Sequence, residues 1–274
     1  MPTMADRDAT DSEFGDDDLL RYSRQILLPG FELAGQQALT RARVLVIGAG
    51  GLGCPAVLYL AAAGVGHIAV ADADTIELSN LQRQIAHRTE DIGRAKAERL
   101  TEASAALNPR VNLRPLAVRV DDAWLAGNLT GGGVPSFDLV LDCSDNFATR
   151  HAVNRACHAA RIPLVSGAAI RVEGQLAVFD FARAQTPCYA CLYGEHGTDD
   201  ESCVRNGVLA PVTGVIGALQ ALAALRLLAG YGERAHGRLD VFDGLHGEWR
   251  RLRIAADPAC PVCSGQKPGG KGGA

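Results

Sequence analysis

The sequence lacks features that mark nucleic-acid-binding, membrane and secreted proteins. Its 27 lysines and arginines are outnumbered by 31 aspartates and glutamates, giving a formal net charge of −4, so no basic field favours nucleic acid. The most apolar stretch, residues 207–230, contains Gln220 and Arg226 and is predicted to be a buried core helix rather than a membrane span. The N-terminus is acidic and polar, not a secretory signal, so we expect a cytoplasmic protein.

No internal repeat and no interdomain linker interrupt the 274 residues. That length can bury one large core. We therefore predict a single domain over residues 19–263, preceded by a disordered lead over residues 1–18 and followed by a flexible tail over residues 264–274.

Short apolar runs alternate with helical stretches up to residue 170. The expected strands are residues 43–48, 67–72, 111–120, 137–143 and 163–170, with helices at 51–66, 93–109, 121–129 and 146–162. This alternation predicts an α/β fold with a parallel, doubly wound, Rossmann-like sheet. Later runs at 172–181, 237–244 and 248–254 alternate in period two, so we expect antiparallel strands that extend the same sheet.

A glycine-rich turn, GAGGLG at residues 48–53, follows the first predicted strand. Gly48, Gly50 and Gly53 fit G-x-G-x-x-G, in which the backbone and the next helix N-terminus approach a phosphate. Asp72 ends the next strand, where its carboxylate can accept ribose hydroxyls. The turn predicts a bound nucleotide, and taken alone it suits a nicotinamide-dependent oxidoreductase.

Polar and cationic residues follow the second strand. Asn80, Gln82 and Arg83 lie just past Asp72, and Lys96 opens the next helix. A triphosphate carries more charge than a dinucleotide, and cationic groups in a water-poor site stabilise the charge on departing pyrophosphate. The alternative is that Arg83 and Lys96 are solvated surface charges.

Two carboxylates come at the end of the strand at residues 137–143. Asp142 and Asp145, in LDCSDN, are expected at the sheet edge where open α/β sheets bind ligands. One of them is predicted to hold Mg²⁺. The competing interpretation is that either carboxylate caps the following helix.

Two C-x₂-C pairs are separated by about 70 residues. Four thiolates from Cys188, Cys191, Cys260 and Cys263 suit a tetrahedral, structural Zn²⁺ site. Two redox pairs or four free thiols are the alternatives. Such a site would tie the end of the chain to a mid-chain loop.

Seven segments together resemble the MoeB/ThiF family of bacterial relatives of ubiquitin-activating enzymes. They are, in chain order, RYSRQILL, GAGGLGCPA, DADTIELSNLQRQ, GRAKAE, LDCSDN, SGAAIRVEGQ and CPVC. The resemblance covers residues 19–263. It implies an enzyme that uses ATP and Mg²⁺ to adenylate the C-terminal glycine of a small ubiquitin-like sulfur carrier, releasing pyrophosphate and preparing a thiocarboxylate.

The resemblance also implies roles for individual residues. Asp145 matches the magnesium-binding aspartate, and Arg24 matches an arginine that reaches the partner's site across a homodimer. The nucleotide-binding residues expected are Gly48, Gly50, Gly51, Gly53, Asp72, Ser79, Asn80, Leu81, Gln82, Arg83, Lys96, Asp145 and Asn146. The catalytic residues expected are Arg24, Arg83, Lys96, Asp145 and Cys203.

Cys203 lies in GEHGTDDESCVRNG, a polar stretch that reads as a loop. Arg205 nearby would favour its thiolate, and the family places a sulfur-handling cysteine here. An inert thiol is the alternative.

The pathway stays open. RYSRQILL and VFDGLHGEWRRL look more like ThiF, which acts in thiamine synthesis, whereas SGAAIRVEGQ looks more like MoeB, which acts in molybdopterin synthesis. The carrier is therefore MoaD-like or ThiS-like. No rhodanese segment follows Cys263, so we expect sulfur to come from another protein.

Overall fold

The computed structural model describes residues 14–131, 134–183, 186–194, 207–233 and 236–264. Its centre is an eight-stranded sheet in the order β10-β9-β8-β7-β6-β1-β2-β3. The strands of this sheet are β1 (Arg43–Ile47), β2 (His67–Ala71), β3 (Asn112–Leu116), β6 (Leu139–Asp142), β7 (Leu164–Ile170), β8 (Glu173–Phe179), β9 (Arg238–Asp243) and β10 (Glu248–Arg253). A separate short hairpin pairs β4 (Thr130–Gly131) with β5 (Val134–Pro135).

The pairing of neighbouring strands changes from parallel to antiparallel at β7. Strands β3, β2, β1, β6 and β7 pair in parallel, whereas β7, β8, β9 and β10 pair antiparallel. Helices connect the parallel strands because a parallel neighbour needs a long crossover. Short turns join β7 to β8 and β9 to β10, whereas residues 180–237 separate β8 from β9. The predicted fold class, a doubly wound sheet extended by antiparallel strands, is confirmed.

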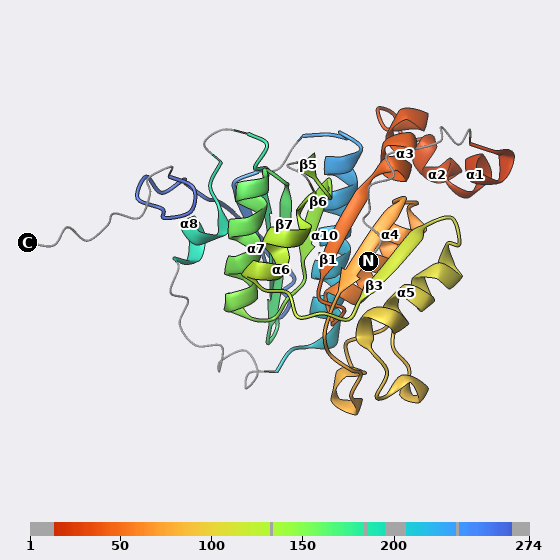
Figure 1. The fold of residues 1–274 in the computed structure, drawn as a ribbon, viewed down its shortest axis with the longest axis horizontal. Helices are drawn as coiled ribbons and strands as arrows, with labels where there is room; N and C mark the ends of the chain where they lie inside the picture. Colours follow the sequence, from red (N-terminus) through yellow and green to blue (C-terminus); the bar gives the residue numbers. More distant parts are fainter. Residues whose placement is uncertain (1–13, 132–133, 184–185, 195–206, 234–235, 265–274) are drawn as a thin grey trace, which may run out of the picture.

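Helices cover both faces of the sheet (Figure 1). Their bounds are α1 (Asp16–Arg21), α2 (Ser23–Ile26), α3 (Glu32–Arg41), α4 (Gly53–Ala62), α5 (Lys96–Leu107), α6 (Asp122–Asn128), α7 (Phe147–Ala160), α8 (Tyr189–Tyr193) and α10 (Ala210–Leu228), with 3₁₀ turns η1 (Leu78–Asn80) and η2 (Thr89–Asp91). One apolar core joins α3, α4, α5 and α10 to one face of the sheet. A second core joins α6, α7 and α8 to the other face.

Helix α10 is the apolar stretch predicted as a core helix. Its length and composition would also suit a membrane span, but Ile216 and Ala224 are fully buried and the helix packs on α4, β7 and β8. Gln220 is equally buried, and its Nε2 donates to the carbonyl oxygen of Asp142 at 2.8 Å. This hydrogen bond therefore holds α10 against the carboxyl end of β6. The candidate site described below lies at the same end of the parallel strands.

Among the expected boundaries that differ from the observed ones, two are at the N-terminus and near the site. Helix α1 begins at Asp16, so three residues of the expected disordered lead are helical. Strand β3 ends at Leu116 rather than at residue 120, and Arg119 and Val120 instead line a cavity. Because β3 is an edge strand, pairing stops where β2 ends at Ala71, which is paired with Leu116.

Candidate active site

A large cavity opens at the carboxyl ends of the parallel strands. Its volume is about 1100 Å³, and its lining includes Ile47, Ala71 and Cys143, at or just past the ends of β1, β2 and β6. Open α/β sheets bind ligands at this edge, and small-molecule sites reach roughly this size. The sequence-predicted residues in its lining are Gly48, Gly50, Gly51, Asp72, Asn80, Gln82, Arg83, Lys96, Asp145 and Asn146.

The glycine turn forms one wall of this cavity. Gly48 has φ +100°, and a Cβ there would lie 2.7 Å from the carbonyl oxygen of Cys143, so only glycine fits. A Cβ on Gly53 would overlap the carbonyl oxygen of Gly48, which is why α4 can start so close to β1. Gly48, Gly50 and Gly51 therefore bring bare backbone to the lining of the cavity, next to the N-terminus of α4.

Asp72 connects the end of β2 to the glycine turn. Its Oδ2 accepts a hydrogen bond from the Ala49 amide at 2.7 Å, and its Oδ1 accepts one from the Asp74 amide at 2.8 Å. Burial raises the pKa of Asp72, and the two amides act in the opposite direction. Each carboxylate oxygen has a second lone pair, so Asp72 can hold the turn and still accept hydrogen bonds from a ribose.

The cationic residues line the same cavity. Lys96 is the first residue of α5 and is 7% exposed, with its Nζ 3.0 Å from Asp74 Oδ2. Arg83 Nη1 donates to the carbonyl oxygen of Ser79 at 3.2 Å. Asn80 uses its Oδ1 in the capping box of η1. A nearly buried ammonium beside an exposed carboxylate is suited to exchange that partner for a phosphate.

The two aspartates of LDCSDN occupy different environments. Asp142 is fully buried, and its carboxylate accepts hydrogen bonds from the Ser144 amide, the Ser144 hydroxyl and the Ser166 hydroxyl at 3.1, 2.6 and 3.1 Å. Asp145 is exposed and lines the cavity. Asn146 caps α7 by accepting from the Thr149 amide. Of the two carboxylates, Asp145 is the one placed to hold a cation.

The four cysteines of the two C-x₂-C pairs converge. All four Sγ atoms lie within 4.8 Å of one another, with Cys188 to Cys260 at 3.6 Å and Cys191 to Cys263 at 3.3 Å. Zn–S bonds of about 2.3 Å in a tetrahedron would separate the sulfurs by about 3.8 Å. The cluster can therefore hold a metal ion, and it joins α8 to the chain after β10.

Comparisons with known proteins agree with this geometry. The model of the ThiF family matches residues 22–262. The chain is 46% identical over 252 residues to the molybdopterin-synthase adenylyltransferase of Escherichia coli, covering 92% of this chain and 99% of the relative.

This chain belongs to the ThiF family.

Two further proteins are similar to this ThiF-family chain. The sulfur carrier protein ThiS adenylyltransferase of E. coli is 46% identical over 250 residues, covering 91% of this chain and 97% of the relative. The crystal structure of E. coli MccB with ATP shares the fold, with a TM-score of 0.76 at 24% identity, covering 89% of this chain and 74% of the other. The predicted family is confirmed, and these comparisons give no support to a nicotinamide-dependent oxidoreductase.

Four of the residues predicted to bind nucleotide or act in catalysis lie outside the lining of the cavity. Gly53 packs α4 against the glycine turn, and the Ser79 hydroxyl donates to Glu77. Leu81 follows η1, and Arg24 is exposed on α2. Cys203 falls outside the residues that the structure describes.

The cavity of this ThiF-family protein also contains residues that sequence reasoning missed. Gln84 is 3% exposed, and its buried Oε1 has no hydrogen-bond partner among the residues that the structure describes. Arg150, one turn into α7, lines the cavity and donates to the carbonyl oxygen of Ser144 at 2.7 Å. Gln84 ends the motif that supplied Asn80 and Arg83, and Arg150 is five residues after Asp145, so proximity in sequence was the available signal.

The other buried cysteines are structural. Burial raises the pKa of Cys54 to about 12 and raises the pKa values of Cys143 and Cys157 as well. All three thiols are therefore protonated near neutral pH, which suits small core residues and not nucleophiles.

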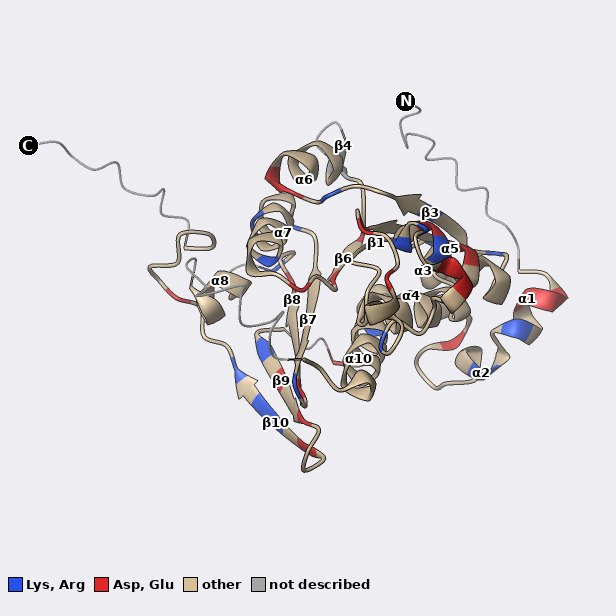
Figure 2. Ribbon diagram, turned by 90° about the horizontal axis from the view of Figure 1, so that it is seen from below, with Lys and Arg blue, Asp and Glu red and all other residues tan. Residues whose placement is uncertain are grey.

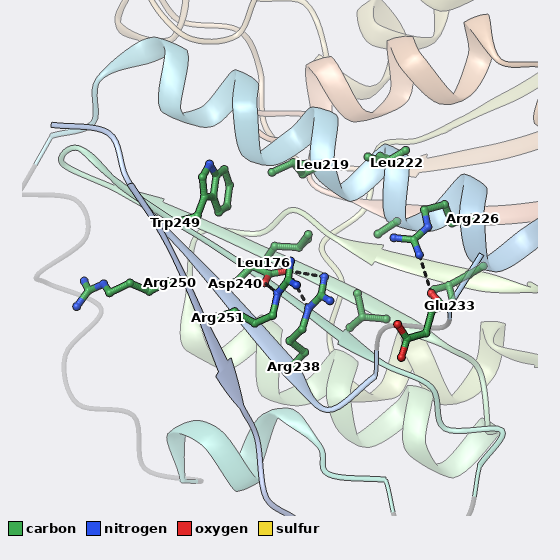
Figure 3. A pocket seen from close by; sticks show the side chains of 13 residues that line it. Leu176, Leu219, Leu222, Arg226, Glu233, Arg238, Asp240, Trp249, Arg250 and Arg251 are labelled. Carbon is green, nitrogen blue, oxygen red and sulfur yellow. Dashed lines mark hydrogen bonds and ion pairs between the residues drawn. The ribbon is translucent and has the colours of Figure 1, made fainter. Parts of the chain in front are cut away.

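A second, smaller groove lies between α10 and β8–β10 (Figure 3). It has a volume of about 330 Å³. Leu219 and Leu222 face it from α10, while Arg238 and Arg251 converge on Asp240, each at 2.9 Å. Figure 2 shows the basic residues along β10. The groove contains none of the predicted site residues, so the larger cavity is the candidate active site.

Proposed function

We propose that this protein uses ATP to adenylate the C-terminal carboxylate of a small ubiquitin-like sulfur carrier. The observation that carries the proposal is the convergence of the glycine turn, Arg83, Lys96 and Asp145 on one cavity. The names of the two E. coli relatives support the carrier as the second substrate. The products would be a carrier acyl-adenylate and pyrophosphate.

The residues of the cavity fit ATP. The Cβ-free turn at Gly48 and the N-terminus of α4 suit phosphate oxygens, and Asp72 suits the ribose hydroxyls. Lys96 and Arg83 would neutralise the charge that develops on pyrophosphate as the carboxylate attacks the α-phosphorus. Lys96 is nearly buried, so its charge acts in a region of low dielectric constant.

We propose that Asp145 holds Mg²⁺ in this reaction. The ion, when bound, would reduce repulsion between the carboxylate of the carrier and the phosphates. The same proposal assigns Zn²⁺ to Cys188, Cys191, Cys260 and Cys263. All four positions would be filled by thiolates, which is the arrangement of a structural site.

The part of the cavity beside β7 is suited to the carrier's C-terminal tail. It is lined by Ala168, Ala169 and Ile170 at the end of β7, and by Gln175, to which the Tyr193 hydroxyl donates. Small side chains there leave room for an extended glycine-rich segment. We propose that the tail enters along β7 and reaches the glycine turn.

We propose that the protein works as a cytoplasmic homodimer supplied with sulfur by a separate donor. Arg24 is exposed on α2 and is outside the lining of the cavity. In a dimer it could extend into the cavity of the partner, as expected from the resemblance. Cys203 would act after adenylation, on the activated carbonyl.

ATP–pyrophosphate exchange tests this function. Exchange should require the enzyme, Mg²⁺ and either a MoaD-like or a ThiS-like carrier, and should disappear with a carrier lacking its C-terminal glycine. Elemental analysis of the same preparation should find one zinc per chain. Exchange that is independent of both carriers, or binding of reduced nicotinamide cofactor instead of ATP, would reject the proposal.

A further inference from the structure

Helix α8 connects the four-cysteine cluster to the lining of the active-site cavity. Helix α8 starts between the two cysteines of the first pair, with Cys188 as its N-cap. Tyr189 and Tyr193, at the two ends of α8, both line the cavity. Tyr189 is 2% exposed, and its ring centroid lies 4.6 Å from that of Tyr193.

Helix α8 packs on the first turns of α7. The Tyr189 amide donates to Asn154 Oδ1 at 2.9 Å, and the Tyr189 ring meets His151 edge-on with centroids 5.2 Å apart. Tyr193 meets Phe147, the first residue of α7, with centroids 6.1 Å apart. The contacts are therefore concentrated at the end of α7 that follows Asp145.

Arg150 connects this packing to the Asp145 segment. Its Nη2 donates to the carbonyl oxygen of Ser144, the residue before Asp145, at 2.7 Å. Arg150 stands on α7 between Phe147 and His151, the residues that Tyr193 and Tyr189 contact, and it lines the cavity together with both tyrosines. Arg150 thus links the part of α7 on which α8 packs to the backbone that carries Asp145.

We propose that the four-cysteine site positions Asp145, through α8 and Arg150, for the binding of Mg²⁺. This inference rests on the proposed function. Arg150 would be a positioning residue, because it holds the backbone before Asp145.

The position of α8 depends on the four-cysteine site because α8 is short. A five-residue helix is far too short to be stable by itself, so its place depends on the anchor at Cys188 and Cys191. Without a metal ion, the four sulfurs have no common partner. Tyr189 and Tyr193 would then lose their fixed positions against α7, and the Arg150 hydrogen bond to Ser144 would open more often.

Hydrogen exchange measures this coupling without relying on activity. The Ser144 and Thr149 amides donate to the side chains of Asp142 and Asn146, so they report the order of the Asp145 segment. Peptides covering residues 143–150 are compared with peptides covering β1 and β2. Calorimetry of ATP binding at a series of Mg²⁺ concentrations gives the second readout.

The variants are Arg150→Gln, Arg150→Lys, Tyr189→Leu and Tyr189→Phe, together with protein stripped of metal by a chelator. Arg155→Gln is the matched control, because Arg155 is also on α7 but has a side chain that is 40% exposed and pairs with Asp122. Arg150→Gln, Tyr189→Leu and metal removal should speed exchange in residues 143–150 and leave β1 and β2 unchanged. They should also raise the Mg²⁺ concentration needed for half-maximal ATP binding by about 10-fold or more, the size of effect seen for groups that orient metal ligands.

Tyr189→Phe and Arg150→Lys keep the packing volume and should give smaller changes in the same direction, so they replace any variant that fails to fold. The inference is overturned if folded variants and metal-stripped protein match Arg155→Gln in both readouts. Failure of the proposed function would look different. In that case the wild-type protein would show no carrier-dependent exchange, while hydrogen exchange would still report whether α8 orders residues 143–150.

Discussion

The two aspartates of LDCSDN give the sharpest test of the site, because one is buried and the other exposed. Each aspartate is replaced by asparagine, in the variants Asp142→Asn and Asp145→Asn. This substitution removes the negative charge and keeps the shape of the side chain. Asp142 accepts three hydrogen bonds inside the fold, whereas Asp145 lines the cavity. The two substitutions should therefore separate stability from chemistry.

The magnitudes follow from those contacts. Weakening three hydrogen bonds to a charged acceptor costs about 1 kcal/mol each, and the lower cost of burying a neutral amide leaves a net loss of about 2 kcal/mol for Asp142→Asn. Asp145→Asn is a surface change and should alter the free energy of unfolding by less than about 0.5 kcal/mol. Loss of a group that stabilises transition-state charge typically lowers the rate by about 100- to 1000-fold, so Asp145→Asn should lower carrier-dependent exchange by at least that factor.

Urea unfolding and ATP–pyrophosphate exchange are measured on both variants at the same Mg²⁺ concentration. Asp142→Asn should shift the unfolding midpoint and keep measurable exchange where it is folded. The reasoning is refuted if Asp145→Asn exchanges within about threefold of wild type, a loss far below that expected for a charge-stabilising group. If Asp142→Asn is as stable as wild type but inactive, the magnesium role belongs to Asp142.

Three further predictions concern other parts of the molecule. Gly53→Ala should lower both stability and ATP affinity, because its Cβ would overlap a carbonyl oxygen of the glycine turn; thermal unfolding and calorimetry check this, and normal ATP binding would contradict it. Mixing Arg24→Ala with Asp145→Ala protein should restore part of the exchange activity, and no recovery after confirmed subunit exchange would mean that Arg24 does not act across a dimer. Cys203→Ala should keep exchange within a few-fold of wild type and reduce thiocarboxylate formation, measured by mass spectrometry of the carrier; loss of exchange in the folded variant would place this residue in the first step.

Sequence patterns predicted the parts of this protein that depend on local chemistry. The glycine turn, the alternation of strands and helices and the period-two runs after residue 170 each reflect backbone geometry that neighbouring residues determine. The four cysteines could be paired because metal ligation needs a recognisable spacing. Lys96 and Asp145 were expected at one edge of the sheet because open α/β sheets bind ligands at the carboxyl ends of their strands.

The contacts that could not be predicted join residues far apart in the chain. Gln220 reaches the end of β6 across 78 residues, and nothing in the sequence of α10 indicates which of its polar residues is buried. Arg150 reads as one of two arginines on α7, and only the structure shows that it donates to the backbone of Ser144. Asp142 likewise accepts a hydrogen bond from Ser166 on β7, a contact that local sequence does not indicate.

The central claim is that the cavity transfers AMP from ATP to a carrier carboxylate. Intact mass spectrometry of a purified MoaD-like or ThiS-like carrier, incubated with wild-type protein, ATP and Mg²⁺, measures this directly. We predict a carrier species heavier by one adenylyl group, which reverts to free carrier when pyrophosphate is added and is absent with Asp145→Asn protein. A protein that binds ATP in the cavity but leaves both carriers unmodified would contradict the account.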